Sequence, residues 1–445
     1  MSTRSGDGRA VVVGGRRPLR GRMRVPGCKG LSHRALLFAA VAEGTSRISH
    51  LAPGGDVRRT RRALGLLGVR TRPTGPPDAR DESLDVHGEG FDGLGEPKDV
   101  IACGNSATTA RMLLGLLGGR PFLSVLTGDR SLVQRPMTRV VQPLRALGAW
   151  IDGRANASVL PLAVRGGPLQ GARIELEVSS GQVKTALVLA GLQAAGTTEI
   201  VEPAASRDHT ERMLRALGAP VEVVDARTVR VVAGTPEAFE LDVPGDPSSA
   251  AFFLVGAAIT PGSDLVIEDL LLNPGRIAFL EVLERMGADV RVEPAGERLG
   301  EPFGAVGVRS GSLAGTVVDC HEAIIDEVPA LAVAAAFADG VTEFRGAGEM
   351  RVKETDRIAT LEAELTKLGV GVEGTADGLV VRGGIAGGTV PAVALTSHGD
   401  HRIALAAAIA GNAFDGSVTI EGFAAAAVSY PDFLADLDAL TGASR

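Results

Sequence analysis

Residues 350–358, with the sequence MRVKETDRI, bring cations and carboxylates together at the start of an amphipathic helical pattern. Apolar residues recur at spacings of three and four from Ile358 to Leu368, and Gly369 ends the pattern. Because a helix dipole disfavours a cation in the first turn, we expect a bound anion to compensate Arg357. The alternative interpretation is a solvent-exposed charge run. The charged residues of the stretch are Arg351, Lys353, Glu354, Asp356 and Arg357.

Similar polar motifs precede other helical patterns. In PGCKGLSHR, residues 26–34, backbone N–H groups, Lys29 and Arg34 can form an anion site, although the P-loop pattern is absent. IACGNSATTAR, residues 101–111, repeats the arrangement, with Asn105 as the predicted N-cap. Further polar starts are SSGQ at 179–182, DE at 326–327 and DHR at 400–402. Each alone is compatible with a solvated surface, but together they favour a substrate carrying several phosphate or carboxylate groups.

These motifs belong to a unit that occurs six times along the chain. Each unit has a helix rich in alanine and leucine, a glycine and a β-like run, then a second helix and, in five units, a second β-like run. The pattern predicts an α/β fold in which six units gather into two clusters of three. The spacing between successive units is least regular between the third and the fourth, which predicts a domain boundary at 241–246. We expect the chain to cross between the two domains a second time at 25–27. The glycines that follow the first helices are Gly44, Gly119, Gly196, Gly262, Gly340 and Gly416.

Composition excludes several classes of protein. A net charge of −7, with one Trp and one Tyr, argues against binding to nucleic acid. No apolar run is long enough to span a membrane, and the polar start MSTRSGDGRA lacks the apolar core of a signal peptide. Three scattered cysteines and seven histidines show no metal-ligand spacing. We therefore expect a cytoplasmic protein that needs neither a metal nor an organic cofactor.

The motifs GNSATTAR, RVKETDR and GDHR, supported by VPGDPSSAAFF and IIDEVPALAVAAAFA, resemble the 5-enolpyruvylshikimate-3-phosphate synthase family. The resemblance extends from about Pro26 to Pro431, and the sequence as a whole is most similar to the glyphosate-tolerant bacterial class. It implies two similar domains, each of three βαβαββ repeats in an inside-out α/β barrel, closing on substrates in the cleft between them. We expect domains at 26–243 and at 1–25 plus 244–445. The implied reaction transfers the carboxyvinyl group of phosphoenolpyruvate to shikimate 3-phosphate, in aromatic amino acid biosynthesis.

The resemblance also implies roles for individual residues. Asp326 would accept the proton of the attacking 5-hydroxyl, Glu354 would handle the proton at the methylene carbon, and Lys29 would touch both substrates. The implied ligands of shikimate 3-phosphate are Lys29, Gly30, Arg34, Ser179, Ser180, Gln182, Arg207, Asp326 and Lys353. Those of phosphoenolpyruvate are Lys29, Asn105, Ala107, Arg135, Gln182, Arg357 and Arg402. Arginine suits such ligands because its planar guanidinium forms paired hydrogen bonds with phosphate or carboxylate.

The chain departs from the family pattern at several positions. Cys28 and Gly30 replace the usual residues beside Lys29, and Gly30 removes a hydroxyl expected on the shikimate phosphate. Ala107 stands where the glyphosate-sensitive class has glycine, so we expect tolerance of glyphosate. Val428 replaces a lysine that one branch of the family places before the final Tyr-Pro or Phe-Pro.

Two alternatives stay open. The chain could use UDP-N-acetylglucosamine as acceptor, in the related transferase family, although the early Lys-Asn pair and the reactive loop cysteine of that family are absent. It could also be a non-catalytic relative that binds a metabolite, which Gly30 alone favours. A two-domain clamp of this size is expected to work as a monomer.

Overall fold

The computed structural model describes residues 3–4, 10–75, 82–321, 323–385 and 392–442, so most of the polar start lies outside the described residues. The chain forms two compact units. The first-half unit comprises Gly27–Val243 and Glu297–Glu301, and the second-half unit comprises Met1–Pro26, Pro244–Gly296 and Pro302–Arg445. The domains expected at 26–243 and at 1–25 plus 244–445 stay a prediction, which differs from this division at Pro26 and at Glu297–Glu301.

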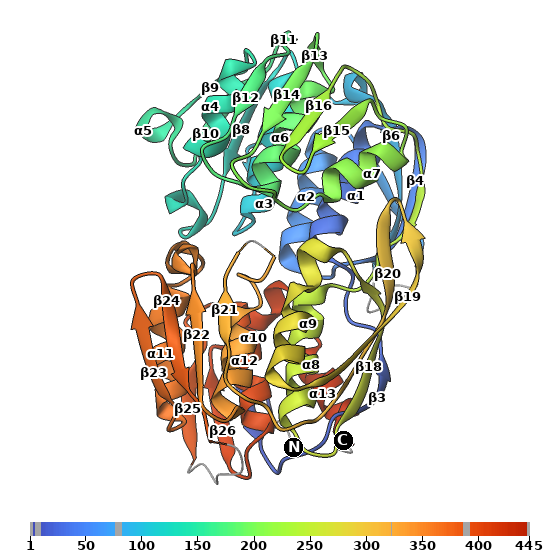
Figure 1. The fold of residues 1–445 in the computed structure, drawn as a ribbon. Helices are drawn as coiled ribbons and strands as arrows, with labels where there is room; N and C mark the ends of the chain where they lie inside the picture. Colours follow the sequence, from blue (N-terminus) through green and yellow to red (C-terminus); the bar gives the residue numbers. More distant parts are fainter. Residues whose placement is uncertain (1–2, 5–9, 76–81, 322, 386–391, 443–445) are drawn as a thin grey trace. The chain divides into compact units, whose positions relative to one another are not determined.

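The first-half unit contains three four-stranded sheets with one topology, a parallel pair extended by two antiparallel strands (Figure 1). The first sheet has the order β17 (Glu240–Asp242), β4 (Glu43–Leu51), β6 (Glu82–Glu89) and β5 (Arg70–Pro73). The second has the order β7 (Ile101–Ala102), β8 (Leu123–Thr127), β10 (Leu162–Arg165) and β9 (Trp150–Gly153). The third has the order β12 (Arg173–Glu175), β14 (Thr198–Val201), β16 (Thr228–Val231) and β15 (Val221–Asp225), and β11 (Leu169–Gln170) pairs with β13 (Ala194–Ala195).

Three buried helices form the interior of this unit: α1 (Lys29–Val41), α3 (Ala107–Gly118) and α6 (Gly181–Gly191). Their sequences are apolar on nearly every face, as expected for helices covered on all sides. Three further helices follow strands β4, β8 and β14 in the chain, and each buries one face. They are α2 (Gly55–Leu66), α4 (Thr138–Ala146) and α7 (His209–Ala216). Short elements are α5 (Arg154–Ala157) and the 3-10 helices η1 (Phe91–Gly93) and η2 (Leu132–Gln134).

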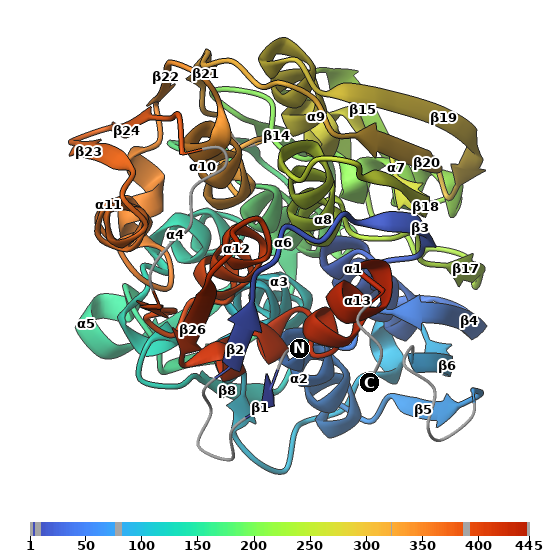
Figure 2. The ribbon, with the colours of Figure 1, turned by 90° about the horizontal axis from the view of Figure 1, so that it is seen from below.

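The second-half unit repeats the same sheet topology three times, and strands from the start of the chain complete two of the sheets. One sheet has the order β3 (Arg20–Met23), β18 (Asp264–Leu271), β20 (Glu301–Arg309) and β19 (Asp289–Arg298). Another has the order β21 (Val317–Asp319), β22 (Val341–Arg345), β24 (Gly378–Arg382) and β23 (Gly371–Thr375). Figure 2 shows β2 beside β26 in the last sheet, of order β25 (Val393–Thr396), β26 (Ser417–Glu421), β2 (Ala10–Val13) and β1 (Thr3–Arg4).

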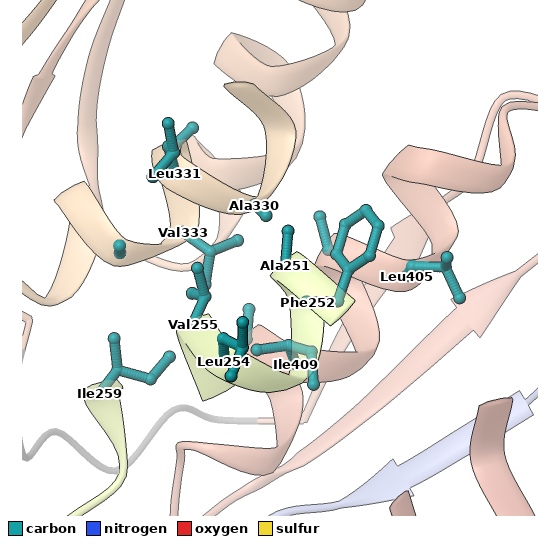
Figure 3. Packing of buried hydrophobic residues seen from close by; sticks show 14 of the residues in the cluster. Ala251, Phe252, Leu254, Val255, Ile259, Ala330, Leu331, Val333, Leu405 and Ile409 are labelled. Carbon is teal, nitrogen blue, oxygen red and sulfur yellow. The ribbon is translucent and has the colours of Figure 1, made fainter. Parts of the chain in front are cut away.

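Helices α8 (Pro247–Ile259), α10 (Val328–Phe337) and α12 (His401–Asn412) are buried along their whole length in this unit. Their apolar side chains pack together. Phe252, Val255, Val333 and Ile409, for example, belong to one cluster (Figure 3). Outer helices are α9 (Pro274–Met286), α11 (Arg357–Lys367) and α13 (Phe433–Leu440), with 3-10 helices η3 (Gly348–Val352) and η4 (Phe423–Val428). Among the described residues, no helix is both long and apolar enough to cross a membrane.

The predicted α/β class with two similar three-repeat halves is confirmed by the six equivalent sheets and by the six buried helices that follow the predicted glycine-terminated pattern. Glycines after these helices, such as Gly44, Gly262 and Gly340, adopt positive φ, which explains why that position favours glycine. The strands that the structure describes form separate mixed sheets rather than a closed barrel.

Candidate active site

The first helix start of the first-half unit presents Lys29. Helix α1 begins at Lys29 after Cys28, with no side chain capping its first turn. Lys29 Nζ donates to Asp56 Oδ2 at 3.1 Å, so the ammonium is paired with a carboxylate from the start of α2. At Gly30 an added Cβ would meet only ordinary van der Waals neighbours, the nearest being Arg34 Nη1 at 3.6 Å. The backbone therefore has room for a side chain at residue 30.

Arg34 lies inside the unit. Its guanidinium donates to Thr210 Oγ1 (2.8 Å), Thr185 Oγ1 (2.9 Å) and the carbonyls of Gly30 (3.0 Å) and Gly181 (3.1 Å). Four of its five N–H donors are thus used by neutral acceptors from three helices. Burial lowers the pKa of Arg34 to about 10, although Glu211 opposes that effect. Its role as a phosphate ligand stays a prediction, for which one N–H remains.

The start of α3 brings together several residues that the sequence singled out. Asn105 accepts from Arg135 Nη2 at 3.0 Å and donates to Asp129 Oδ2 at 2.8 Å. The N-cap is Ser106, whose hydroxyl accepts from the backbone N–H of Thr109, so the prediction of Asn105 as N-cap is wrong by one residue. The Asn105 side chain instead links the loop of Asp129 to Arg135. Ala107 is the first helical residue and is buried.

The start of α6 carries a second polar group. Gln182 accepts from Arg111 Nη1 at 2.7 Å and donates to Thr108 Oγ1 at 3.0 Å, so it joins α6 to the first turns of α3. Ser180 caps α6, and Ser179 Oγ donates to the carbonyl of Ala204 at 2.6 Å. An added Cβ at Gly181 would lie 3.4 Å from the Cβ of Arg207, which places Arg207 beside this helix start.

A buried ion cluster behind α6 was not expected from the sequence. Lys184 Nζ lies 2.9 Å from Glu202 Oε2 and 2.6 Å from Glu211 Oε1, and all three side chains are at most 5 % exposed. Glu202 Oε1 also accepts from the backbone N–H of Ser180 at 3.1 Å. Burial raises the pKa of Glu211, although the ammonium of Lys184 opposes that effect. Glu202 therefore connects this cluster to the N-cap residue Ser180. In the sequence, the cluster was indicated by Lys184, a lysine within a largely apolar helix.

In the second-half unit, Arg357 is the centre of a charged cluster. Its Nε donates to Asp400 Oδ2 at 2.8 Å, its Nη2 donates to Glu354 Oε2 at 2.7 Å, and its Nη1 lies 3.7 Å from Asp326 Oδ1. Burial opposes the cation, but Asp400, Glu354 and Asp326 together raise the pKa of Arg357. The expectation that only a bound anion compensates this helix-start cation is therefore wrong. Asp400, the N-cap of α12, already does so from inside the protein.

Arg402 lies two residues after Asp400, and its backbone N–H donates to Asp400 Oδ1 at 2.8 Å. Its Nη1 donates to the backbone carbonyl of Asp326 at 2.6 Å, and its Nη2 lies 3.6 Å from Asp326 Oδ2. Asp326 thus has an arginine on each side, Arg357 and Arg402. Such an arrangement can hold an anion while keeping a carboxylate ionised beside it.

A network at the start of α8 supports Arg402. Ser248 Oγ donates to Glu327 Oε1 and accepts from Arg276 Nη2 at 2.8 Å, and Arg276 also pairs with Asp246, the N-cap of α8. The sequence marked Glu327 as part of a polar helix start, but gave no role to Asp246, Ser248 or Arg276, although acids recur at the N-caps of α8, α11 and α12.

Lys353 is more exposed than Arg357. Its Nζ lies 3.3 Å from Glu349 Oε1, and Arg351 pairs with Asp356, the N-cap of α11. The charge run is therefore divided: Arg351 and Lys353 make partly exposed pairs, whereas Arg357 is 1 % exposed. The interpretation of the run as a solvated surface is wrong for Arg357.

Among the described residues, one group of side chains could hold a metal ion: Asp208, His209 and Glu301, whose ligand atoms lie within 4.8 Å of one another. His209 Nδ1 lies 2.7 Å from Glu301 Oε1, and Asp208 pairs with Arg212. We interpret these contacts as structural, because they attach the segment Glu297–Glu301 to α7, rather than as a metal site.

Taken unit by unit, the first-half unit offers a lysine, an arginine, amides and hydroxyls at three helix starts. The second-half unit offers two arginines flanking Asp326, with Glu354 on one of them. These groups suit the binding of anions together with the movement of protons by two carboxyl groups.

Comparison with known proteins agrees with this chemistry. The family model for EPSP synthase (3-phosphoshikimate 1-carboxyvinyltransferase) matches residues 13–437. A 3-phosphoshikimate 1-carboxyvinyltransferase of Synechococcus sp. is 46% identical over all of this chain and 99% of the relative, and one of Chloroflexus aurantiacus is 50% identical over 93% and 95%. A solved EPSP synthase from Acinetobacter baumannii is 38% identical, covers 97% of this chain and 98% of its own, and superposes with a TM-score of 0.86. The enolpyruvyl transferase NikO from Streptomyces tendae shares the fold, with a TM-score of 0.77 at 20% identity and coverage of 97% and 96%. The chain therefore belongs to the EPSP synthase family of 3-phosphoshikimate 1-carboxyvinyltransferases.

Proposed function

We propose that this transferase of the aromatic amino acid pathway carries out its reaction with the residues at these helix starts. The carboxyvinyl group of phosphoenolpyruvate passes to the 5-hydroxyl of shikimate 3-phosphate, and phosphate is released. The observation that carries the proposal is the position of Arg357 among Glu354, Asp326 and Asp400. Its Nη1 lies 3.7 Å from Asp326 Oδ1 and donates no hydrogen bond within the described residues, so one donor is left for an anionic substrate.

We assign a set of residues to each substrate, and Lys29 and Gln182 belong to both sets. We assign the carboxylate and phosphate of phosphoenolpyruvate to Lys29, Asn105, Ala107, Arg135, Gln182, Arg357 and Arg402. We assign shikimate 3-phosphate to Lys29, Gly30, Arg34, Ser179, Ser180, Gln182, Arg207, Asp326 and Lys353. Each charge-assisted hydrogen bond contributes roughly 1.5–3 kcal/mol, so several are needed to bring two anions together.

The reaction needs an acid and a base. Asp326 takes the proton of the 5-hydroxyl as its oxygen bonds to C2 of phosphoenolpyruvate, while Glu354 gives a proton to C3. The tetrahedral intermediate then returns a C3 proton to Glu354 as the bond from C2 to the phosphate oxygen breaks. Acid–base catalysis contributes about 3–5 kcal/mol, whereas orientation contributes on the order of 7–11 kcal/mol. We therefore expect positioning of the two anions to be the larger effect.

A phosphate-release assay tests this assignment. The enzyme is mixed with phosphoenolpyruvate and either shikimate 3-phosphate or UDP-N-acetylglucosamine. We expect release with shikimate 3-phosphate alone. Release with UDP-N-acetylglucosamine would favour the other transferase activity, and no release with either acceptor would favour a metabolite-binding relative.

We further propose that the enzyme tolerates glyphosate. Ala107 is buried at the first position of α3, beside Asn105, where a methyl group excludes a longer inhibitor more than the smaller substrate. We expect Ala107→Gly to lower the inhibition constant for glyphosate at least tenfold while changing the KM for phosphoenolpyruvate less. An inhibition titration measures both, and a sensitive parent enzyme that Ala107→Gly leaves unchanged would contradict the proposal.

Gly30 offers a test of the shikimate phosphate site. Because a Cβ fits at residue 30, Gly30→Ser should add a hydroxyl without displacing its neighbours. We expect the KM for shikimate 3-phosphate to fall roughly fivefold, the effect of one hydrogen bond worth about 1 kcal/mol. Steady-state kinetics measure this value, and an unchanged KM would remove residue 30 from the phosphate site. The monomeric state and the cytoplasmic location stay predictions.

A further inference from the structure

A chain of buried hydrogen bonds joins three helices of the first-half unit. His33 of α1 lies with Nδ1 2.7 Å from Thr60 Oγ1 of α2, and Thr60 Oγ1 lies 2.7 Å from Thr109 Oγ1 of α3. Thr109 Oγ1 then donates to Ser106 Oγ at 2.8 Å. All four side chains are at most 1 % exposed. We call these four residues the α3 relay.

The donor and acceptor of each hydrogen bond in the α3 relay follow from Ser106, its last residue. Ser106 Oγ accepts the backbone N–H of Thr109 as the N-cap of α3, and it also accepts the Thr109 hydroxyl. Thr109 must therefore accept from Thr60, and Thr60 must accept from His33. A hydroxyl both donates and accepts, so each step is satisfied only if the proton of His33 resides on Nδ1. Bonds aligned in this way strengthen one another.

The end of the α3 relay lies between two residues assigned to phosphoenolpyruvate. Ser106 separates Asn105, which carries the contact with Arg135, from Ala107. Helix α2, which supplies Thr60, also supplies Asp56, the partner of Lys29. Through Thr60, the relay holds the start of α3 at a fixed distance from the residues around Lys29.

His33 itself does not act in the chemistry. Its Nε2 is buried and has no hydrogen-bond partner within the described part of the chain. Burial lowers the pKa of His33 to about 3, so the imidazole stays neutral at ordinary pH. A neutral, enclosed ring suits a fixed donor rather than a group that exchanges protons with substrate.

We propose that Thr60 is a positioning residue for the phosphoenolpyruvate site, because its hydroxyl connects His33 to the cap of α3. The proposal rests on the assignment of Asn105 and Ala107 to phosphoenolpyruvate. It predicts that loss of the Thr60 hydroxyl weakens the binding of phosphoenolpyruvate more than that of shikimate 3-phosphate. Arg34, which follows His33 on α1, is held by α6 and α7 rather than by Thr60, and Ser179 and Ser180 belong to α6 and its cap.

The test compares three variants by steady-state kinetics with both substrates. Thr60→Val keeps the shape and removes the hydroxyl, so the KM for phosphoenolpyruvate should rise roughly three- to tenfold while that for shikimate 3-phosphate stays within twofold. Thr60→Ser restores the hydroxyl and should restore the KM. Thr198→Val is the matched control, because Thr198 is also fully buried in this unit and its hydroxyl makes no hydrogen bond with the described residues. It should leave both KM values unchanged.

A spectroscopic measurement covers the case in which Thr60→Val does not fold. Nitrogen-15 NMR of wild-type His33 should show a neutral ring protonated on Nδ1 at pH 7. A ring protonated on Nε2, or a folded Thr60→Val with both KM values unchanged or raised equally, would overturn the proposal. An inactive wild-type enzyme would instead overturn the proposed function and leave the NMR result to decide the relay.

Discussion

Arg34 and Arg357 are both buried arginines close to a helix start, but their surroundings differ. Arg34, in the first-half unit, is 4 % exposed and donates only to carbonyl and hydroxyl oxygens. Arg357, in the second-half unit, is 1 % exposed and lies among three carboxylates. Burial lowers the pKa of Arg34 to about 10, whereas the carboxylates outweigh burial and raise the pKa of Arg357.

The difference separates two uses of a buried cation. Neutral acceptors tie Arg34 to α6 and α7, so this arginine holds helices together and has one N–H left for the proposed shikimate phosphate. Carboxylates share the charge of Arg357, and two of them, Glu354 and Asp326, are the groups proposed to move protons. Under this proposal, a substrate anion bound by Arg357 lies beside both of these carboxyl groups.

The largest effect should come from Arg357→Met. The change leaves Asp400, which is fully buried, without its cation, and loss of one partner from a buried ion pair costs about 3–5 kcal/mol. We expect that decrease in the free energy of unfolding, measured by urea denaturation. A loss below 1 kcal/mol would show that the carboxylates do not depend on Arg357.

Acid should destabilise the first-half unit through His33. Its pKa is lowered by burial from 6.5 to about 3, so below pH 6.5 the unfolded chain binds a proton that the folded chain does not. Stability should fall by roughly 2 kcal/mol between pH 6.5 and pH 5, and continue to fall towards pH 3.

The matched variant for this prediction is His33→Asn, whose side-chain amide can donate to Thr60 without titrating. Urea denaturation at several pH values should give a shallower pH dependence for His33→Asn than for wild type. Parallel curves for the two proteins would mean that His33 does not contribute.

The smallest effect should come from Arg34→Met. Its hydroxyl acceptors keep other partners, because Thr185 Oγ1 also bonds Thr210 Oγ1 and the carbonyl of Gly181. No buried carboxylate loses a direct hydrogen bond, so we expect a loss of only about 1–2 kcal/mol, measured as for Arg357→Met. A loss equal to that of Arg357→Met would remove the contrast between the two arginines.

The repeat, the α/β class and the helix starts could be predicted from the sequence because their signals are local. A glycine follows each buried helix, and at Gly44, Gly196, Gly262 and Gly340 it adopts positive φ, which favours glycine. Polar residues before the same helices located Lys29, Asn105 and Arg402 at helix starts. Apart from the repeat itself, such signals depend on residues that are close together in the sequence.

The partners of these residues could not be predicted, because they come from distant segments. Asp400 is 43 residues from Arg357, and strands β13 and β14 separate Glu202 from Lys184 in the chain. A hydrophobic or charged pattern reports that a side chain needs a partner, but not which one the fold supplies. The same limit explains the N-cap error at Asn105, where Ser106 also has a suitable side chain.

Glu354→Gln tests the central claim most directly. Glutamine keeps an oxygen that can accept from Arg357 Nη2 but cannot exchange a proton with C3 of phosphoenolpyruvate. We expect kcat to fall about 10²- to 10⁴-fold while equilibrium binding of phosphoenolpyruvate changes less than threefold. Glu373→Gln, at an exposed position on β23, is the control and should keep the parent kcat. A Glu354→Gln enzyme with kcat within fivefold of the parent would contradict the account.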